Sequence, residues 1–281
     1  MITTDSTADI SPEIAEKYNI RTAPLHVLYD EEDFTDGVDI TPEYILKRYE
    51  ERKQLPSTSA VTPEGYRLFF KRIIREGYTE IVHIAFASDM SSTYQNAVIA
   101  AQDFDEKIYV IDSRVLSCGM MLLAIRACEL RDMGLSGERI AQNVTDLIEK
   151  NVGGFLLSQL EFLHKGGRCS GVSLLGANLL NIKPSIIVKD GVMTVSKKYR
   201  GRDADCRLKY LKDRIAEYGD TIDTRRVVLH TTCDFSPKEK KQYKKELKKL
   251  LDCDEILMTT AGCVITSHCG PGTFALFFMT K

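Results

Sequence analysis

The sequence contains no run close to the roughly 18 uninterrupted apolar residues that a membrane-spanning helix requires. Its first segment, MITTDSTADIS, is polar from the third residue, so it lacks the pattern of a signal peptide. Excess charge is lacking too, because 38 basic and 40 acidic residues leave a net charge of −2. These absences argue against nucleic acid and a bulk anionic membrane as partners. We expect a cytoplasmic protein with no stable membrane insertion and at most transient membrane contact.

Paired cysteines are also lacking. The eight cysteines are scattered and form no C-x-x-C pair, so we expect reduced thiols in packing roles. Cys263, His268 and Cys269 are the closest cluster of metal-ligand residue types. Adjacent positions rarely converge on one tetrahedral centre, and no second ligand pair exists. We therefore expect no metal site.

The common catalytic and cofactor motifs are absent. There is no G-x-S-x-G elbow, no H-E-x-x-H pair and no G-x-G-x-x-G after the first strand. In the polar loops, hydroxyl groups greatly outnumber candidate bases. That balance favours capture of an anion over nucleophilic catalysis, so we expect no catalytic residue and no cofactor.

What is present is an alternation of short apolar runs with helical patterns over the first 150 residues. Ser11-Pro12 and Thr41-Pro42 are typical of helix starts, and EIVHIAFA and KIYVID are typical of buried strands. IRTAPLHVLYD is expected to form one extended run. Strands interleaved with helices predict a mainly parallel sheet flanked by helices.

The pattern changes near Gly153. Two β-rich arms around Asp190-Gly191 predict a β-hairpin, and further strands and a helix follow. The lysine-rich helix pattern after residue 236 places Tyr243 and Leu247 on one face, so we interpret its lysines as a solvated surface. We predict a two-domain α/β protein, with an N-terminal domain over residues 1–153 and a C-terminal α/β domain with a mixed sheet over residues 154–281.

Several polar segments sit where strands should end, which is where ligands bind in open α/β sheets. Residues 55–59 form a proline turn with the hydroxyls of Ser57, Thr58 and Ser59, one of which a helix cap would explain. Residues 88–95 are followed by a helix, whose free N–H groups and dipole make Ser91 and its neighbours a plausible anion site.

Two glycine-containing segments complete the set of candidates. Residues 164–168 place a glycine pair beside Arg168, a pattern that a plain turn explains equally well. Residues 266–273 join two apolar runs and place His268 beside Gly270-Pro271-Gly272, where glycine permits close approach of a ligand.

Six motifs in this order resemble the DegV family over nearly the whole chain. They are D-S-T-A-D-I at residues 5–10, P-S-T-S at 56–59, S-S-T-Y-Q-N-A at 91–97, V-I-D-S at 110–113, L-E-F-L-H-K-G-G-R at 160–168 and S-H-C-G-P-G at 267–272.

The resemblance implies a two-domain α/β protein that holds a long-chain fatty acid in a tunnel. It implies that Thr58 and Ser91 hold the carboxylate and that Arg168 and His268 lie near it. Ser59, Ser92 and Gly270 are further ligand-binding candidates from the same motifs. The family includes acyl-binding subunits of bacterial fatty-acid kinase, which implies a carrier that presents the carboxylate to a separate kinase in phospholipid metabolism.

Two positions depart from the family pattern. Ser92 stands where the family usually has glycine, which adds a side chain beside the carboxylate site. Ala60-Val61 replaces the more usual Q-P pair after P-S-T-S. Neither departure removes the matched hydroxyl groups.

Two other functions stay open from the sequence. A small esterase or phosphotransferase could act through His268 or Ser91, and a regulatory protein could use its ligand to control docking of a partner. For the carrier, we expect apolar residues from segments 155–163, 172–188 and 274–279 to help line the tunnel.

Overall fold

The computed structural model describes residues 1–169 and 182–281. Its first sheet is fully parallel, with strand order β2-β1-β6-β7, as the sequence predicts. The strands of this sheet are β1 (Ile2–Asp5), β2 (Ile20–Ala23), β6 (Glu80–Ala85) and β7 (Lys107–Asp112). The helices of this half are α1 (Pro12–Tyr18), α2 (Pro42–Arg52), α3 (Pro63–Arg75), α4 (Thr93–Ala101), α5 (Cys118–Asp132) and α6 (Gly137–Asp146), with the 3₁₀ turns η1 (Ser6–Ala8) and η2 (Ile148–Lys150).

Three helix starts follow the same local chemistry. The side chains of Ser11, Thr41 and Thr62 cap α1, α2 and α3, and each cap is followed by a proline. Proline lacks an N–H group that the first turn would leave unpaired in any case. The cap of α3 is therefore Thr62, which leaves Thr58 free of that role.

The segment IRTAPLHVLYD is not one strand, in contrast to the prediction. It divides at Pro24 into β2 and β3 (His26–Tyr29), which belong to different sheets. Proline cannot donate to a β-ladder, and Leu25 N–H donates instead to the Ser6 hydroxyl at 3.0 Å. Strand β3 joins a small antiparallel sheet with β4 (Glu32–Thr35) and β5 (Ser57–Ser59), so the expected hydroxyl-bearing turn is a strand.

The second large sheet is mixed, with order β10-β9-β8-β13-β11-β12, and its only parallel pair among the described strands is β11 with β12. The predicted hairpin is confirmed, with Asp190 and Gly191 at φ 53° and 79°. The strands are β8 (Asn151–Leu156), β9 (Ile182–Lys189), β10 (Val192–Arg200), β11 (Ile222–Thr231), β12 (Glu255–Thr260) and β13 (Phe274–Thr280). The helices are α7 (Glu161–Gly166), α9 (Asp203–Tyr218), α10 (Pro237–Leu250) and α11 (Cys263–Cys269), with η3 (Gly219–Thr221).

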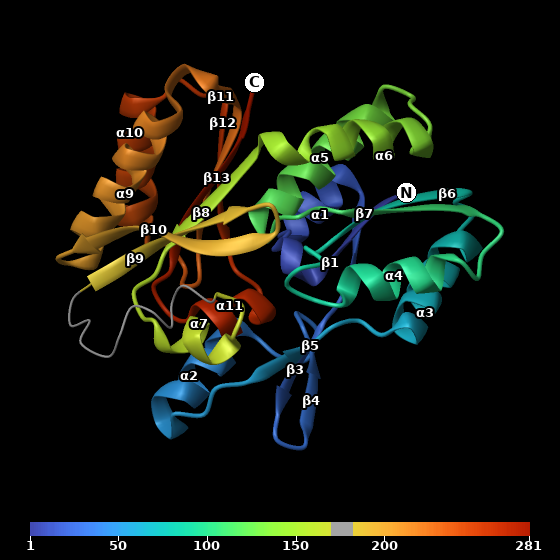
Figure 1. Cartoon of the computed structure of the whole chain (residues 1–281), viewed down its shortest axis with the longest axis horizontal. Helices are drawn as coiled ribbons and strands as arrows, with labels where there is room; N and C mark the ends of the chain where they lie inside the picture. The colour runs from blue at the N-terminus through green and yellow to red at the C-terminus, as the bar shows by residue number, and fades with distance from the viewer. Residues whose placement is uncertain (170–181) are drawn as a thin grey trace.

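Figure 1 shows how these parts lie together. The mixed sheet with α9 and α10 forms one side of the molecule, the parallel sheet forms the other, and α7 and α11 lie near the small sheet where the two sides meet. Strand β8 pairs with β9 and β13 and so belongs to the mixed sheet. The predicted boundary between residues 153 and 154 cuts this strand, whereas a boundary drawn by sheet membership would lie before Asn151. The division into two domains stays a prediction.

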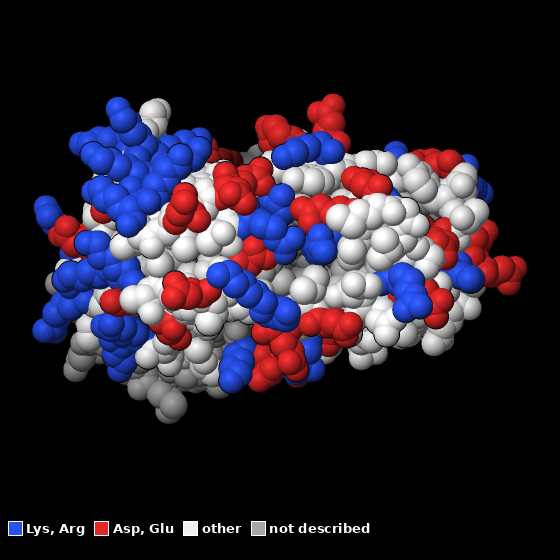
Figure 2. Space-filling view, turned by 90° about the horizontal axis from the view of Figure 1, so that it is seen from above, with Lys and Arg blue, Asp and Glu red and all other residues white. Residues whose placement is uncertain are grey.

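Helix α10 has the two faces that its sequence predicts. Tyr243 and Leu247 are buried, and all seven of its lysines are exposed. Figure 2 shows Lys and Arg gathered at one end of the molecule. Among the described helices, none combines the length and apolar character that crossing a bilayer requires.

A buried polar cluster joins the two sides of the molecule. Asp9 Oδ2 accepts a hydrogen bond from the Ser117 hydroxyl at 2.5 Å and lies 3.1 Å from His230 Nε2. His230 Nδ1 lies 2.8 Å from the Thr259 hydroxyl. Burial opposes the charge on His230, but the Cys118 sulfur and the Asp9 carboxylate raise its pKa to about 10. The His230 imidazole is therefore protonated at neutral pH.

We predict that Asp9→Asn lowers the free energy of unfolding by about 3–5 kcal/mol, because it leaves the buried imidazolium of His230 without its counter-charge. Urea denaturation at pH 7 measures the change. Asp252→Asn, at an exposed position, is the matched control and should shift stability by less than about 0.5 kcal/mol. Equal effects of the two substitutions would contradict the ion pair. The contribution of the His230–Asp9 contact to the free energy of unfolding should be full below pH 6.5, the ordinary pKa of histidine. It should disappear as the pH rises through about 10, because folding raises the pKa of His230.

Candidate functional site

A cavity of about 200 Å³ lies where elements from both sides of the molecule meet. It contains every ligand-binding candidate from the sequence except Gly270. Its polar lining residues are Thr58, Ser59, Ser91, Ser92, Arg168 and His268. Its apolar lining residues are Leu25, Ala60, Phe86, Met90, Leu116, Leu163, Met193, Val264, Ile265 and Cys269.

Thr58 and His268 are brought together although 210 positions separate them in the chain. The Thr58 hydroxyl lies 2.8 Å from His268 Nε2. Thr58 is held by β5, where it pairs with Val27 of β3, and His268 is held by α11. The sequence predicted a loop over residues 266–273, but the structure places a helix over the first part of it, which orients His268 rigidly.

Gly166 packs directly against the other side of the imidazole. A Cβ atom at Gly166 would overlap His268 Nδ1, so a larger residue cannot occupy this position without moving the ring. Among the described residues, Nδ1 has no hydrogen-bond partner although it is buried. Gly166 therefore allows the close packing of His268. The sequence alone, which a plain turn explained equally well, did not predict this role.

The imidazole of His268 is neutral at physiological pH. Burial, with the Arg168 guanidinium as a second cause, lowers its pKa to about 4. A neutral ring bonded to a hydroxyl can share a proton with a ligand but cannot supply a full positive charge. Arg168 is thus the one permanent cation among the described lining residues, and none of them is an aspartate or glutamate.

Ser91 and Ser92 precede α4 and belong to the same wall. The Ser91 hydroxyl accepts a bond from Thr93 N–H at 3.2 Å and lies 2.7 Å from the Thr93 hydroxyl. Ser92 is the N-cap residue of α4, but its side chain makes no capping bond. Asn96 of α4 donates to the Val61 carbonyl at 2.8 Å, which holds the start of this helix against the segment after β5. Helix α4 therefore directs its positive end towards the part of the cavity wall that Ser91 and Ser92 form.

Arg168 lies at the outer edge of the cavity. Its side chain is exposed and donates to the Gly166 carbonyl at 2.6 Å. With Thr58 and His268 it also borders an outer hollow of about 320 Å³, whose wall includes Gln54 and Lys165. The hydroxyl-lined end is therefore adjacent to a second, more polar space.

Gly270 is not among the lining residues. It follows α11 with φ 70°, a conformation that favours glycine, and a Cβ atom there would lie 2.5 Å from the Phe162 ring. Burial raises the pKa of the Cys269 thiol to about 12, and the Cys263 sulfur donates to the Ile40 carbonyl at 3.3 Å. Within residues 1–169 and 182–281, no group of histidine, cysteine or acidic side chains is arranged to hold a metal ion.

The sequence did not identify most of the apolar wall. Of the segments expected to line a tunnel, only Leu163 contributes to the cavity among the described residues, and residues 172–181 lie outside the described chain. Val264 and Ile265 immediately precede the predicted His268 segment, and helical spacing within α11 would have placed Ile265 on the same face as His268.

The fold is an α/β fold with one parallel and one mixed sheet, and its cavity has a hydroxyl-lined end and an apolar wall. The chain belongs to the DegV family, because the family model described as "Uncharacterised protein, DegV family" matches residues 1–281. It is 33% identical to a DegV domain-containing protein of Clostridium acetobutylicum over 283 aligned residues, which cover 100% of this chain and 98% of that protein.

Solved structures agree with this assignment. A DegV family protein of Thermus thermophilus, described as binding fatty acid, is 27% identical with a TM-score of 0.87, and the match covers 100% of this chain and 99% of that one. A stearic-acid-binding protein of Eubacterium ventriosum is 28% identical with a TM-score of 0.86, covering 100% and 98% of the two chains.

We predict that Gly166→Ala destabilises the protein by about 1–3 kcal/mol, because the added methyl group displaces His268. Helix propensity alone predicts the opposite sign, since alanine is favoured over glycine within a helix. Chemical denaturation of Gly166→Ala, His268→Ala and the double variant tests the cause. In the His268→Ala background the substitution should become neutral or stabilising, and an unchanged penalty would refute the contact.

We also predict that the His268 imidazole titrates near pH 4 in the ligand-free protein, well below 6.5, the ordinary pKa of histidine. The Cε1 proton resonance, assigned with His268→Gln, measures this pKa by NMR. Since the pKa is lowered on folding, His268 should contribute stability above pH 6.5 that is lost as the pH falls towards 4. A midpoint above pH 6 would contradict a desolvated ring.

Proposed function

We propose that this chain binds a long-chain fatty acid and holds its carboxylate at the hydroxyl-lined end of the cavity. The observation that carries the proposal is the cavity itself, whose described lining combines the hydroxyls of Thr58 and Ser91 with ten apolar residues and includes no carboxylate. The fatty-acid-binding proteins with similar folds support the same assignment.

The proposed head-group contacts avoid the desolvation of a buried cation. Hydroxyl groups of Thr58 and Ser91 would donate to the carboxylate, and the positive end of α4 would stabilise its charge. Ser59, Ser92 and His268 would complete the shell, and Arg168 would act from the edge. Gly270 would act indirectly, through the end of α11 and its contact with Phe162.

The acyl chain would supply most of the affinity. A sixteen-carbon acid has about 15 carbons beyond the carboxyl, and at about 0.8 kcal/mol each their burial is worth on the order of 12 kcal/mol, of which association offsets several. The walls include Met90 and Met193, whose unbranched side chains repack at low energetic cost. In this proposal residues 1–153 carry the head-group loops and residues 154–281 help to enclose the chain.

We further propose that the bound carboxylate is presented to a separate fatty-acid kinase, which would form an acyl phosphate. The outer hollow beside Thr58, Arg168 and His268 supports this step, because it adjoins the carboxylate end of the cavity. An esterase or phosphotransferase is less well supported by the geometry. The Ser91 hydroxyl pairs with Thr93 and the His268 ring with Thr58, so His268 is not aligned as a base on Ser91.

Native mass spectrometry of the purified protein, followed by lipid extraction, should detect one fatty acid per chain. Replacing Thr58 by Val and Ser91 by Ala together should weaken binding of a fluorescent fatty acid at least about a hundredfold, since each lost hydrogen bond to a charged group is worth about 1.5–3 kcal/mol. Ser57→Ala, on the same strand but outside the cavity lining, is the control and should bind normally. A well-folded protein that yields no acyl chain and binds none would exclude the proposal.

The kinase step has its own test. Palmitate-loaded protein, ATP and a purified bacterial fatty-acid kinase should yield acyl phosphate, and free palmitate at the same concentration should yield far less. Arg168→Gln should reduce this yield more than it reduces palmitate binding, because Arg168 lies in both hollows. Equal yields from bound and free palmitate would contradict presentation while leaving fatty-acid binding intact.

A further inference from the structure

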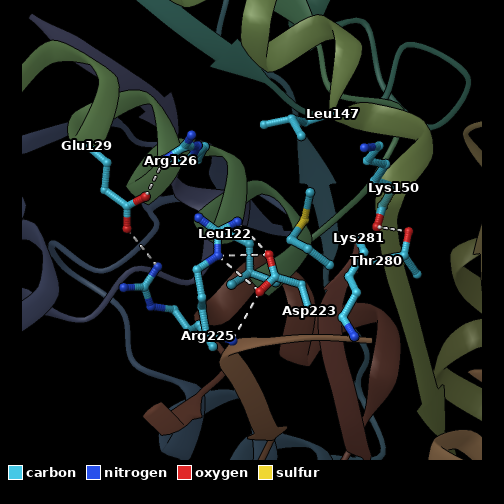
Figure 3. A pocket seen from close by; sticks show the side chains of 11 residues that line it. Leu122, Arg126, Glu129, Leu147, Lys150, Asp223, Arg225, Thr280 and Lys281 are labelled. Carbon is cyan, nitrogen blue, oxygen red and sulfur yellow. Dashed lines mark hydrogen bonds and ion pairs between the residues drawn. The ribbon is translucent and has the colours of Figure 1, made fainter. Parts of the chain in front are cut away.

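A separate hollow of about 140 Å³ lies on the seam between the two sides of the molecule and shares no lining residue with the head-group cavity. Helix α5, the segment around η2, and strands β11 and β13 each contribute to it. Figure 3 shows the side chains of Arg126 and Arg225 on one side of this hollow, those of Lys150 and Lys281 on the other, and that of Asp223 between them.

The charges around this hollow do not cancel. Asp223 is paired with Arg225, and Glu129 is shared between Arg126 at 3.0 Å and Arg226 at 3.2 Å. Arg226 also donates to Glu255. The Lys17 ammonium lies 3.6 Å from the same carboxylate, so two cations share the negative charge of Glu255.

Two cations remain after this pairing. Arg126 has only its share of Glu129, and the Lys150 ammonium has no hydrogen bond or ion pair with any residue in the described part of the chain. The Lys281 ammonium does not reduce this positive charge, because its partner at 2.8 Å is the neutral Asp220 carbonyl. The hollow thus has room for about two negative charges.

Its floor is apolar, which strengthens this preference. Leu122 is 3% exposed, and Leu147 and Met279 lie beside it. An apolar floor lowers the local dielectric constant and increases the attraction between a cation and a bound anion. Its volume of about 140 Å³ is sufficient for a compact anion.

We propose that this hollow is a binding site for a small dianion of the phosphate class, either inorganic phosphate or a compact phosphate monoester. The planar guanidinium of Arg126 matches two phosphate oxygens, and Lys150 supplies the second charge from the opposite side. Because α5 and strands β11 and β13 come from different sides of the molecule, the bound anion stabilises their association. The site is independent of fatty-acid binding.

Calorimetric titration of the full chain with sodium phosphate at pH 8 tests the proposal. Binding should be saturable, and ten times the dissociation constant should raise Tm by about 3 °C relative to sodium chloride of equal ionic strength. Methyl phosphate, titrated in parallel, distinguishes the two sources: tighter binding than phosphate indicates a monoester ligand, and weaker binding indicates the free ion.

Variants locate the anion. Arg126→Gln and Lys150→Gln should each weaken phosphate binding at least about tenfold, as loss of a charge-assisted contact predicts. Arg126→Lys should recover part of the loss, and Lys245→Gln, an equal charge change on α10, should have no effect. If chloride stabilises equally, if phosphate shows no saturable binding, or if all variants bind alike, the site does not exist. Circular dichroism confirms that each variant is folded. If a variant does not fold, the titration of the wild-type protein alone decides whether the phosphate site exists.

Discussion

The position of helix α11 depends on two buried carboxylates that accept its first N–H groups. Asp9 Oδ1 accepts from Gly262 at 2.7 Å, and Asp36 Oδ1 accepts from Cys263 at 2.8 Å. These N–H groups have no acceptor within the helix itself. Negative charge at the N-terminal end also interacts favourably with the helix dipole. Asp9 simultaneously contacts Ser117 and His230. One carboxylate therefore fixes the helix that carries His268 and the seam between the two sheets.

The same arrangement explains why the head-group end can stay nearly neutral. Near the cavity, Asp9 and His230 form a buried pair at 3.1 Å, while the cavity itself has hydroxyls, a neutral imidazole and, at its outer edge, Arg168. Burial raises the pKa of Asp36 and lowers that of His268, so desolvation acts on both groups in the direction of the uncharged form. An anion entering such a cavity meets donors without having to displace a resident carboxylate.

The sequence predicted local features and failed at distant ones. Caps at Ser11 and Thr41, the parallel strands and the Asp190-Gly191 hairpin follow from neighbouring residues. The helix at Cys263–Cys269 was missed because its start is held by Asp9, 253 positions away from Gly262. Six of the seven ligand-binding candidates line the cavity, because hydroxyls in strand-end loops are visible locally and the family motifs specify them. The apolar wall was not found, since ordinary core residues give the same pattern.

Ser92 can be interpreted more closely with the structure than with the sequence. Glycine, the residue expected here from the family resemblance, would suggest a backbone conformation that only glycine adopts easily. Ser92 has φ −72° and ψ 0°, which any residue can adopt without strain, so the backbone of this chain does not require glycine. Its side chain makes no capping bond and lines the cavity. A serine here therefore leaves the turn intact and adds one hydroxyl group to the cavity lining beside Ser91.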